Sequence, residues 1–354
     1  MLLAIFASNI RVMYNLIPMR SLVVALLGWF LLTACSTGSD CEQNPDIAKV
    51  EAPVQLERLE KPFFQIKNPA EAQRFLDQHP LFARQYLLQG RYASDQQLEQ
   101  TMTQLATNAG LQKLGRETET TFRNNDSLQQ QLRGLFQHVR YYYPAFRVPP
   151  VKTFVSGLGK EPEKDALFAN DSLIVLSLDF FVGPAASYRA DVPAYINRRF
   201  TPAHVLPALA LTISSKYNRP LMGNHTMLRD MVQFGKSLYF AEKMLPCTPD
   251  SLLMGYTNKE LAGVQFNEGK IWAHFIEKNL LYTADPFVIK KYIGERPSTP
   301  EIDKTAPGRL GVWVGLQIVR KYMAQHPEVT LPQLMAQRDA QRILNGSHYK
   351  PKRS

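Results

Sequence analysis

Cysteine is scarce in this chain, with three residues among 354. Three are too few for the disulfide scaffold on which many small secreted domains depend. The sequence also has no low-complexity tract and no repeat period, which excludes a solenoid or a propeller. Hydrophobic residues, in contrast, make up 45% of the chain, enough for one large core or two smaller ones. We therefore expect a globular protein in which disorder is confined to the N-terminus.

Clusters of basic residues are also rare, although the formal net charge is +10. Lysine and arginine are scattered, apart from short runs such as Lys290-Lys291 and residues 350–353, and no nucleic-acid recognition motif accompanies them. Residues 1–34 contribute only Arg11 and Arg20, so removing them changes the charge from +10 to +8. We expect no nucleic-acid partner, because scattered positive charge favours solubility and attraction to anionic surfaces such as lipid headgroups.

Long hydrophobic runs are missing except near the N-terminus, where residues 21–32 are almost wholly apolar. This run is shorter than the roughly 20 residues of a membrane-spanning helix, which argues against an uncleaved anchor. Arg20 precedes it and Leu32-Thr33-Ala34-Cys35 ends it, a pattern typical of a lipoprotein signal peptide. The sequence predicts a signal peptide over residues 1–34 and a lipid on Cys35. Each buried acyl methylene would contribute about 0.8 kcal/mol to membrane anchoring.

The stretch after Cys35 is small, polar and mildly acidic as far as Lys49, and it predicts a flexible tether over residues 35–49. No shift in composition follows, so we expect one globular domain over residues 50–354. With Cys35 lipidated, two cysteines remain, Cys41 and Cys247. They form a disulfide in an oxidising compartment or stay as unpaired thiols, and the sequence leaves both possibilities open.

Hydrophobic patterning predicts an α+β fold that is predominantly helical, with a small sheet. Strands are expected at residues 54–59, 151–156 and 173–178, and a polar loop separates the last two. Asn68 before Pro69 is typical of a helix start, and His79-Pro80 ends that helix.

Further helices are expected from the spacing of apolar residues. Within residues 94–139, one buried helical face is predicted from Leu128, Leu132, Leu135, Phe136 and Val139. Later helices are expected at residues 203–217, 267–281, 308–323 and 331–344. Gly311 and Gly315 would let another helix approach closely, and we favour packing within this chain over a membrane dimer.

Several later segments resemble the gliding motility-associated lipoprotein GldB family of Bacteroidetes. They are residues 173–199, Gly255-Tyr256-Thr257, Asn267-Glu268, Gly308-Arg309-Leu310-Gly311 and Tyr349-Lys350-Pro351. The resemblance implies a lipid-anchored protein of the cell envelope that is associated with gliding motility and type IX secretion. We expect it in the outer membrane, and the sequence leaves open which membrane holds the lipid. The family is also distantly similar to zincin-type peptidases, in which a strand pair precedes a helix that carries the metal motif. A degenerate zincin-like architecture is the fold that this resemblance implies.

The zincin metal motif itself is absent. A zincin helix needs H-E-x-x-H, because side chains at i and i+4 share one helix face. The corresponding segment, residues 203–217, has one histidine, His204, and no acid, and none of the seven histidines is followed by glutamate. A helical zinc site of this type is excluded, and we expect no catalytic, cofactor or metal residues.

Other candidate chemistry is weak. His274 and Glu277 lie at i and i+3, with Glu268 two turns earlier, but such a set is more often a solvated helix face. Ser156-Gly157-Leu158-Gly159 lacks the G-x-S-x-G pattern of a nucleophile elbow. Asp179, after the last strand, is expected to cap the turn that follows it, with a binding cleft as the alternative. The aromatic groups Tyr141–Tyr143 and Phe180-Phe181 are expected in the core or, alternatively, in a partner-binding patch.

We therefore expect a non-enzymatic, membrane-anchored envelope lipoprotein that binds other components of the gliding or secretion machinery. One alternative is a hydrolase whose site is assembled from distant residues, for which His225, His274, Glu268 and Asp179 are the candidates. A second alternative is a module that binds lipid or peptidoglycan. Proximity of the four hydrolase candidates in the fold would favour the enzyme.

Overall fold

The computed structural model describes residues 44–158 and 165–352, so Cys35, Cys41 and the signal peptide lie outside the described residues. The first described element is the short helix α2 (Pro45–Ala48), which lies in the predicted tether. Asn44 caps it by accepting the Asp46 N–H at 2.9 Å, and Ile47 is buried. The helix packs on α8 (Asn125–Tyr142). The predicted tether therefore includes a short helix at residues 45–48, because an Asn cap followed by proline begins a helix.

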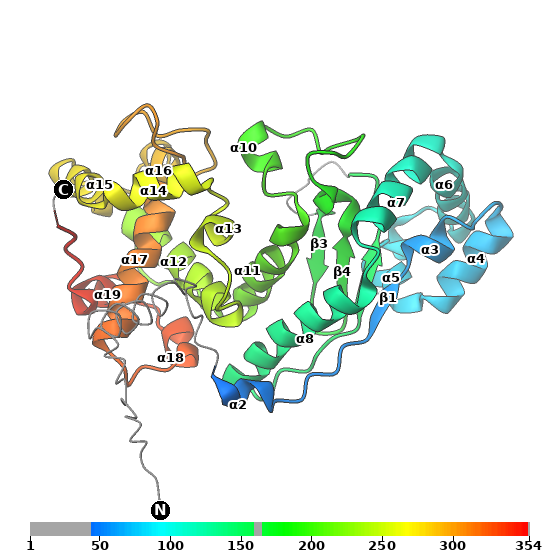
Figure 1. Ribbon diagram of the computed structural model, residues 1–354, viewed down its shortest axis with the longest axis horizontal. Helices are drawn as coiled ribbons and strands as arrows, with labels where there is room; N and C mark the ends of the chain where they lie inside the picture. The colour runs from blue at the N-terminus through cyan, green and yellow to red at the C-terminus, as the bar shows by residue number, and fades with distance from the viewer. Residues whose placement is uncertain (1–43, 159–164, 353–354) are drawn as a thin grey trace, which may run out of the picture. The chain divides into compact units, whose positions relative to one another are not determined.

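A small mixed sheet has the strand order β1-β2-β4-β3 (Figure 1). The strands are β1 (Leu56–Arg58), β2 (Val151–Phe154), β3 (Leu167–Ala169) and β4 (Ile174–Ser177). β1, β2 and β4 are parallel, whereas β3 is antiparallel to β4 at the edge. All three predicted strands are present in shorter form. The sequence does not predict β3, since three residues are too few to establish an alternation.

Each face of the sheet carries its own hydrophobic core. Side chains alternate along a strand, so Leu173 and Val175 join one cluster, whereas Ile174 and Leu176 join the other. The first cluster is covered by helices that precede β2 in the chain: α3 (Glu60–Phe63), α4 (Pro69–Gln78), α5 (Pro80–Gln85), α6 (Asp95–Thr107) and α7 (Ala109–Thr121). The second cluster is larger and includes α8 and the later helices.

Two local predictions in the first half are confirmed at the level of single residues. The Asn68 side chain accepts the Glu71 N–H at 3.0 Å, and α4 ends at Gln78 with His79 as its C-cap. All five apolar residues of the predicted face of α8 are buried. Caps and helical faces depend on residues within one or two turns, which is why the sequence shows them.

The second half of the described chain is helical. It comprises η2 (Leu178–Val182), α10 (Ala194–Asn197), η3 (Pro202–His204), α11 (Val205–Tyr217), α12 (Met227–Met244), α13 (Asp250–Met254), α14 (Asn258–Phe266), α15 (Glu268–Glu277), η4 (Leu280–Tyr282), α16 (Pro286–Ile293), α17 (Leu310–Gln325), α18 (Leu331–Ala336) and α19 (Ala340–Ser347). The helices predicted at 203–217, 267–281 and 308–323 correspond to α11, α15 and α17. The segment 331–344 is divided into two helices, because Asp339 caps a second start by accepting the Arg342 N–H.

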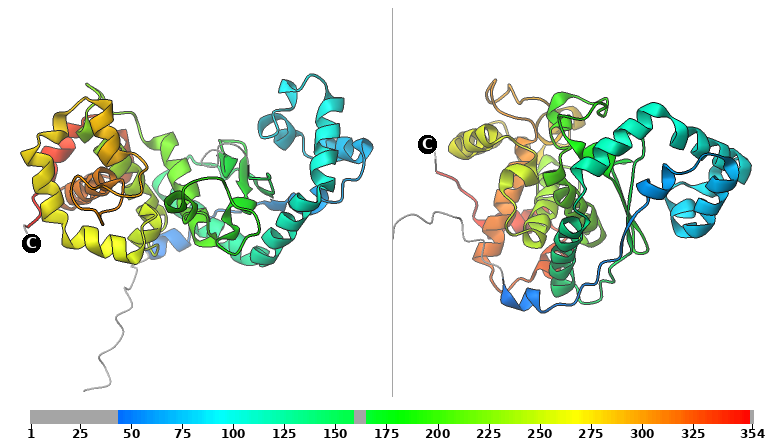
Figure 2. Two further views of the ribbon diagram at one scale, coloured as in Figure 1. Left: turned by 90° about the horizontal axis from the view of Figure 1, so that it is seen from above. Right: turned by 45° about the vertical axis from the view of Figure 1, so that its right-hand side comes forward.

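Helix α17 lies among α12, α15, α16 and α19 (Figure 2). Its contact with α12 is close enough to require glycine on both helices. A Cβ on Gly315 would lie 1.9 Å from the Met231 carbonyl oxygen, and one on Gly235 would lie 2.4 Å from the Gly315 carbonyl carbon. The close approach predicted for Gly311 and Gly315 is therefore confirmed as packing within the chain.

Candidate functional site

The four residues named for a hydrolase have separate structural partners. His225 Nε2 lies 2.9 Å from both carboxylate oxygens of Asp230. His274 Nε2 lies 2.9 Å from the Tyr292 hydroxyl, and Glu268 accepts the Tyr349 hydroxyl at 2.6 Å. Within residues 44–158 and 165–352, no three His, Cys, Asp or Glu side chains are placed to hold a metal ion. The fold does not bring the four candidates together as one site.

Asp179 is buried in η2, with 1% of its surface exposed. Its carboxylate accepts the backbone N–H groups of Ser156, Gly157 and Leu158 at 2.9–3.1 Å, and the Ser156 hydroxyl at 3.1 Å. Gly157 and Leu158 have φ values of +80° and +64°, so the carboxylate stabilises a strained turn. Burial raises the pKa of Asp179, and the N–H donors oppose that rise.

The prediction that Asp179 caps the turn after it is therefore wrong. The turn that it caps follows β2, more than twenty residues earlier in the sequence. The reason is the parallel pairing of β2 and β4, which places the carboxyl ends of both strands at the same edge of the sheet.

Two adjoining hollows of about 580 and 390 Å³ form a groove along α14 and α15, which we call the α14–α15 groove. Asn267, Lys270 and Ile302 border both hollows. The smaller hollow has an apolar lining that includes Val264, Ile271, Ile302, Ala306 and Pro307, with Thr257, Lys259, Glu260, Lys270 and Asp303 among its polar residues. His274 and Glu277 line the larger hollow, where burial and the charge of Lys278 lower the pKa of His274.

The walls of the groove are held by hydrogen bonds. α14 begins with a capping box in which Thr257 and Glu260 satisfy each other's backbone N–H groups. The opposite wall is the loop at residues 299–307, closed by the Thr299 hydroxyl, which donates to the Pro307 carbonyl at 2.7 Å. Phe266, at the rim, is 73% exposed. A hollow with apolar and polar lining residues beside an exposed aromatic ring is suited to binding an apolar side chain of a partner.

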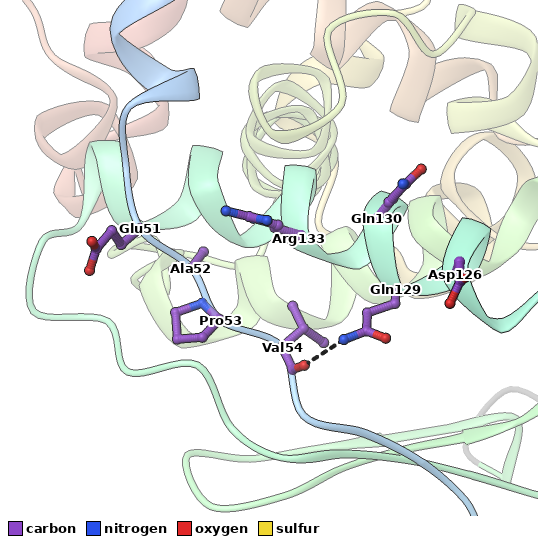
Figure 3. Close-up of a pocket in the computed structure, with 8 residues that line it drawn as sticks. All are labelled: Glu51, Ala52, Pro53, Val54, Asp126, Gln129, Gln130 and Arg133. Atoms are coloured by element: carbon purple, nitrogen blue, oxygen red, sulfur yellow. Dashed lines mark hydrogen bonds between the residues drawn. The ribbon is translucent and has the colours of Figure 1, made fainter.

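A third hollow, of about 560 Å³, lies between the segment Glu51–Val54 and α8. Figure 3 shows Gln129 pointing toward Val54, whose carbonyl accepts the Gln129 amide at 3.0 Å. Asp126, Gln130 and Arg133 follow one another along α8 and do not converge on one point (Figure 3). This hollow is a seam where the N-terminal segment packs on the helix.

The predicted aromatic groups are mostly packed inside the protein, and Cys247 takes part in a disulfide bond. Phe180 and Phe181 are buried at 4% and 1% exposure, and Tyr143 stacks on Tyr217 with ring centres 3.7 Å apart. The expectation of core or half-buried packing is confirmed for these residues, whereas Tyr141 is 37% exposed. Cys247 is disulfide-bonded, so the alternative of an unpaired thiol is wrong for this residue. The partnership with Cys41 stays a prediction, because Cys41 lies outside the described residues.

Residues that carry the family resemblance form ion pairs and hydrogen bonds between distant segments. Arg198 pairs with Glu260 at 2.7 Å, and Glu295 pairs with both Arg199 at 2.9 Å and Arg309 at 3.4 Å. These bonds join the segment after α10 to α14 and to the segments on either side of the loop at 299–307.

Two further bonds involve the same motifs. The Tyr256 hydroxyl donates to the Gly308 carbonyl at 2.7 Å, and Arg309 donates to the Met254 carbonyl at 3.0 Å. Sequence reasoning missed Glu260 and Glu295. The Thr257-x-x-Glu260 capping box was a signal for Glu260, whereas no local signal marks Glu295.

His204, the one histidine in the segment compared with zincins, also has a local partner. Its Nδ1 lies 2.7 Å from the Thr201 hydroxyl, and burial beside Arg199 and Arg198 lowers its pKa to about 4. α11 follows β2 and β4 in the chain as expected, but the likeness to zincins stays a prediction.

Comparison with known proteins supports the resemblance noted in the sequence. The family model described as gliding motility protein GldB matches residues 40–351, which include every motif named above except the lipidation pattern that ends at Cys35. None of the curated proteins and none of the solved structures matches the chain. No helix in the described part has the length and apolar character needed to cross a bilayer. The chain belongs to the GldB family of gliding motility lipoproteins.

Proposed function

We propose that this lipoprotein is a non-catalytic component of the cell envelope. It is held to the outer membrane by a lipid on Cys35 and supports gliding motility and type IX secretion by binding other envelope proteins. The observation that carries the proposal is that the side chains considered for catalysis form hydrogen bonds with other parts of the fold. Asp179 holds a turn, Glu268 binds Tyr349, and His225 and His274 each have a neighbouring partner. The α14–α15 groove, with its exposed Phe266, is the surface to which we assign partner binding.

The partner test compares matched surface variants. Tagged protein is crosslinked in cells and purified from membranes as wild type, Phe266→Asp and Phe234→Asp. Phe234 lies on α12 and is 44% exposed, so its substitution tests for a general effect of a new surface charge. We expect components of the motility or secretion machinery with the wild type and with Phe234→Asp, and at least tenfold less with Phe266→Asp. A substituted hot-spot aromatic typically costs about 2 kcal/mol or more, which gives a factor of this size.

Retention of all partners by Phe266→Asp would show that the groove is not the binding surface. Stoichiometric zinc in the purified protein, with hydrolytic activity that is lost in His274→Ala, would overturn the non-catalytic proposal. His274 is the variant of choice because it and Glu277 both line the larger hollow.

The lipid anchor makes a separate prediction. Intact mass spectrometry of membrane-purified protein is expected to find an N-terminus at Cys35 with an acylated thiol, because small residues and cysteine end the apolar run. The Cys35→Ala protein should carry no lipid, and the control Cys41→Ala should carry the full acyl mass. Lipid on Cys35→Ala, or an unmodified wild type, would contradict the assignment.

A further inference from the structure

Three large apolar side chains are exposed within twelve sequence positions, where α15 passes through η4 into α16. Phe287 is 80% exposed, Tyr282 61% and Ile276 46%, and Phe287 is the most exposed large hydrophobic residue in the described part of the chain. We call these residues, with Lys278, Lys290 and Lys291, the α15–α16 corner; Figure 1 labels both helices at the upper left. Single exposed apolar residues are ordinary, but three within twelve positions form a patch that indicates contact with another surface.

The fold presents this patch on a rigid support. Asp285 caps α16 by accepting the Phe287 N–H at 2.8 Å, and Pro286 occupies the first turn. Buried Ile289, Tyr292 and Ile293 attach the helix to the core. Phe287, Lys290 and Lys291 are spaced i, i+3 and i+4, so they share the opposite, exposed face.

A backbone hydrogen bond also fixes the preceding turn. The Met227 N–H, at the start of α12, donates to the Thr283 carbonyl at 3.1 Å, and both Leu280 and Leu281 are buried. The exposed rings of Tyr282 and Phe287 therefore lie on either side of an anchored segment. Their exposure is a property of the folded protein and does not come from a loosely attached loop.

Positive charge accompanies the aromatic residues. Lys278, Lys290 and Lys291 are all exposed. Three acids lie nearby: Asp285 is engaged in the helix cap, Glu277 lines the groove, and Glu301, whose pKa the charge of Lys291 helps to lower, pairs with Arg296 at 3.2 Å. Aromatic rings beside lysines are the combination that partitions into the headgroup region of anionic membranes.

We propose that the α15–α16 corner docks on the anionic surface of the bilayer, with Phe287 and Tyr282 inserted among the headgroups and the three lysines against lipid phosphates. The inference rests on the lipid anchor of the proposed function. A second contact would orient the domain and present the α14–α15 groove, which shares helix α15, at a defined height above the membrane.

The test uses the mature lipidated protein reconstituted in vesicles. Phe287→Trp places an indole at the corner, and Leu105→Trp, at a 44% exposed site on α6, is the control. Lipids brominated along their acyl chains quench nearby tryptophan, and the wild-type signal is subtracted. In vesicles that contain phosphatidylglycerol we expect severalfold stronger quenching for Phe287→Trp than for Leu105→Trp. Adding Lys290→Ala and Lys291→Ala to Phe287→Trp should lower the docked-to-undocked ratio about fivefold for each lysine.

The outcomes separate the corner from the anchor. Mass spectrometry first confirms that each protein carries its lipid, and a protein without lipid contradicts the proposed anchor. With the lipid present, equal quenching of the two tryptophan variants would overturn the corner proposal. Strong quenching in purely zwitterionic vesicles that does not change with the lysine substitutions would overturn the role of charge. Shielding of the corner only after envelope proteins are added would identify a protein partner and also overturn the proposal.

Discussion

The Asp179 carboxylate stabilises the turn that follows β2. Its two oxygens accept three consecutive backbone N–H groups, two of them from residues with positive φ. A carboxylate is suited to this position, because both oxygens accept hydrogen bonds and ionic acceptors form stronger bonds. A second buried acid has a comparable structural position: Glu60, at 2% exposure, pairs with Arg58 and accepts the Thr153 hydroxyl at 2.6 Å.

Asp179→Ala is expected to destabilise the protein by about 3–5 kcal/mol, because three N–H groups in a buried turn lose their acceptor. The free energy of unfolding, measured by denaturant titration, checks this value. Asp171→Ala is the matched control, since Asp171 is 76% exposed and its ion pair with Lys216 lies at the surface; its cost should stay below about 1 kcal/mol. Similar stabilities of the two variants would contradict the account of the turn.

Sequence reasoning recognised Asp179 as a position but assigned it to the wrong turn. Aspartate often caps a neighbouring turn. Here its carboxylate instead accepts N–H groups from the turn after β2, because the parallel pairing of β2 and β4 brings that turn close. The same limit applies to Glu295, whose two arginine partners lie far away in sequence. Asn68, in contrast, caps its own helix through a local bond, which the sequence predicts.

Helix α12 is the long element that the sequence did not predict. Two residues in its middle weaken the helical pattern: Gly235, a poor helix former, and Lys236, a charged residue on a buried face. Both are explained by tertiary contacts. Gly235 lets α17 approach, and Lys236 donates to the Gln337 carbonyl at 2.7 Å, beyond the end of α18.

Gly315→Ala is expected to cost about 3 kcal/mol, the upper part of the range for overpacking, because the new methyl would overlap the Met231 carbonyl. Thermal unfolding monitored by circular dichroism measures the effect. Gly263→Ala provides the control: Gly263 lies in α14 with no atom within 4 Å of a new Cβ, so alanine should stabilise the helix by about 0.5–1 kcal/mol. An unchanged stability of Gly315→Ala would show that α12 and α17 can move apart at no cost in free energy.

At the scale of the whole molecule, Lys236 connects parts of the chain that are far apart in sequence. Its side chain is fully buried, and its ammonium donates to the carbonyls of Gln337 and Arg219. Burial lowers the pKa of Lys236 from its ordinary value of 10.5 to about 8. Between these two values the unfolded chain binds more protons than the folded protein, so stability rises with pH.

This linkage predicts that the free energy of unfolding contains a contribution from Lys236 that increases by about 2 kcal/mol between pH 7 and pH 9.5. Urea titrations of the wild type and of Lys236→Met at each pH isolate it, because other groups titrate alike in both proteins. The free energy of unfolding of the wild type should increase relative to that of Lys236→Met as the pH rises. A difference that is constant with pH would contradict burial of a charged lysine.

From the amino-acid sequence alone it was possible to derive features that depend on neighbouring residues: the Asn68 cap of α4, the buried face of α8, and the absence of the zinc motif. Each of these features depends on residues within one or two helical turns, where the spacing in the sequence shows which side chains lie on the same face. Tertiary structure decided which turn Asp179 holds, why α12 tolerates a glycine and a lysine, and that α14, α15 and a distant loop enclose a groove. Such contacts join residues separated by long stretches of chain, so only the packing of the elements could bring them together.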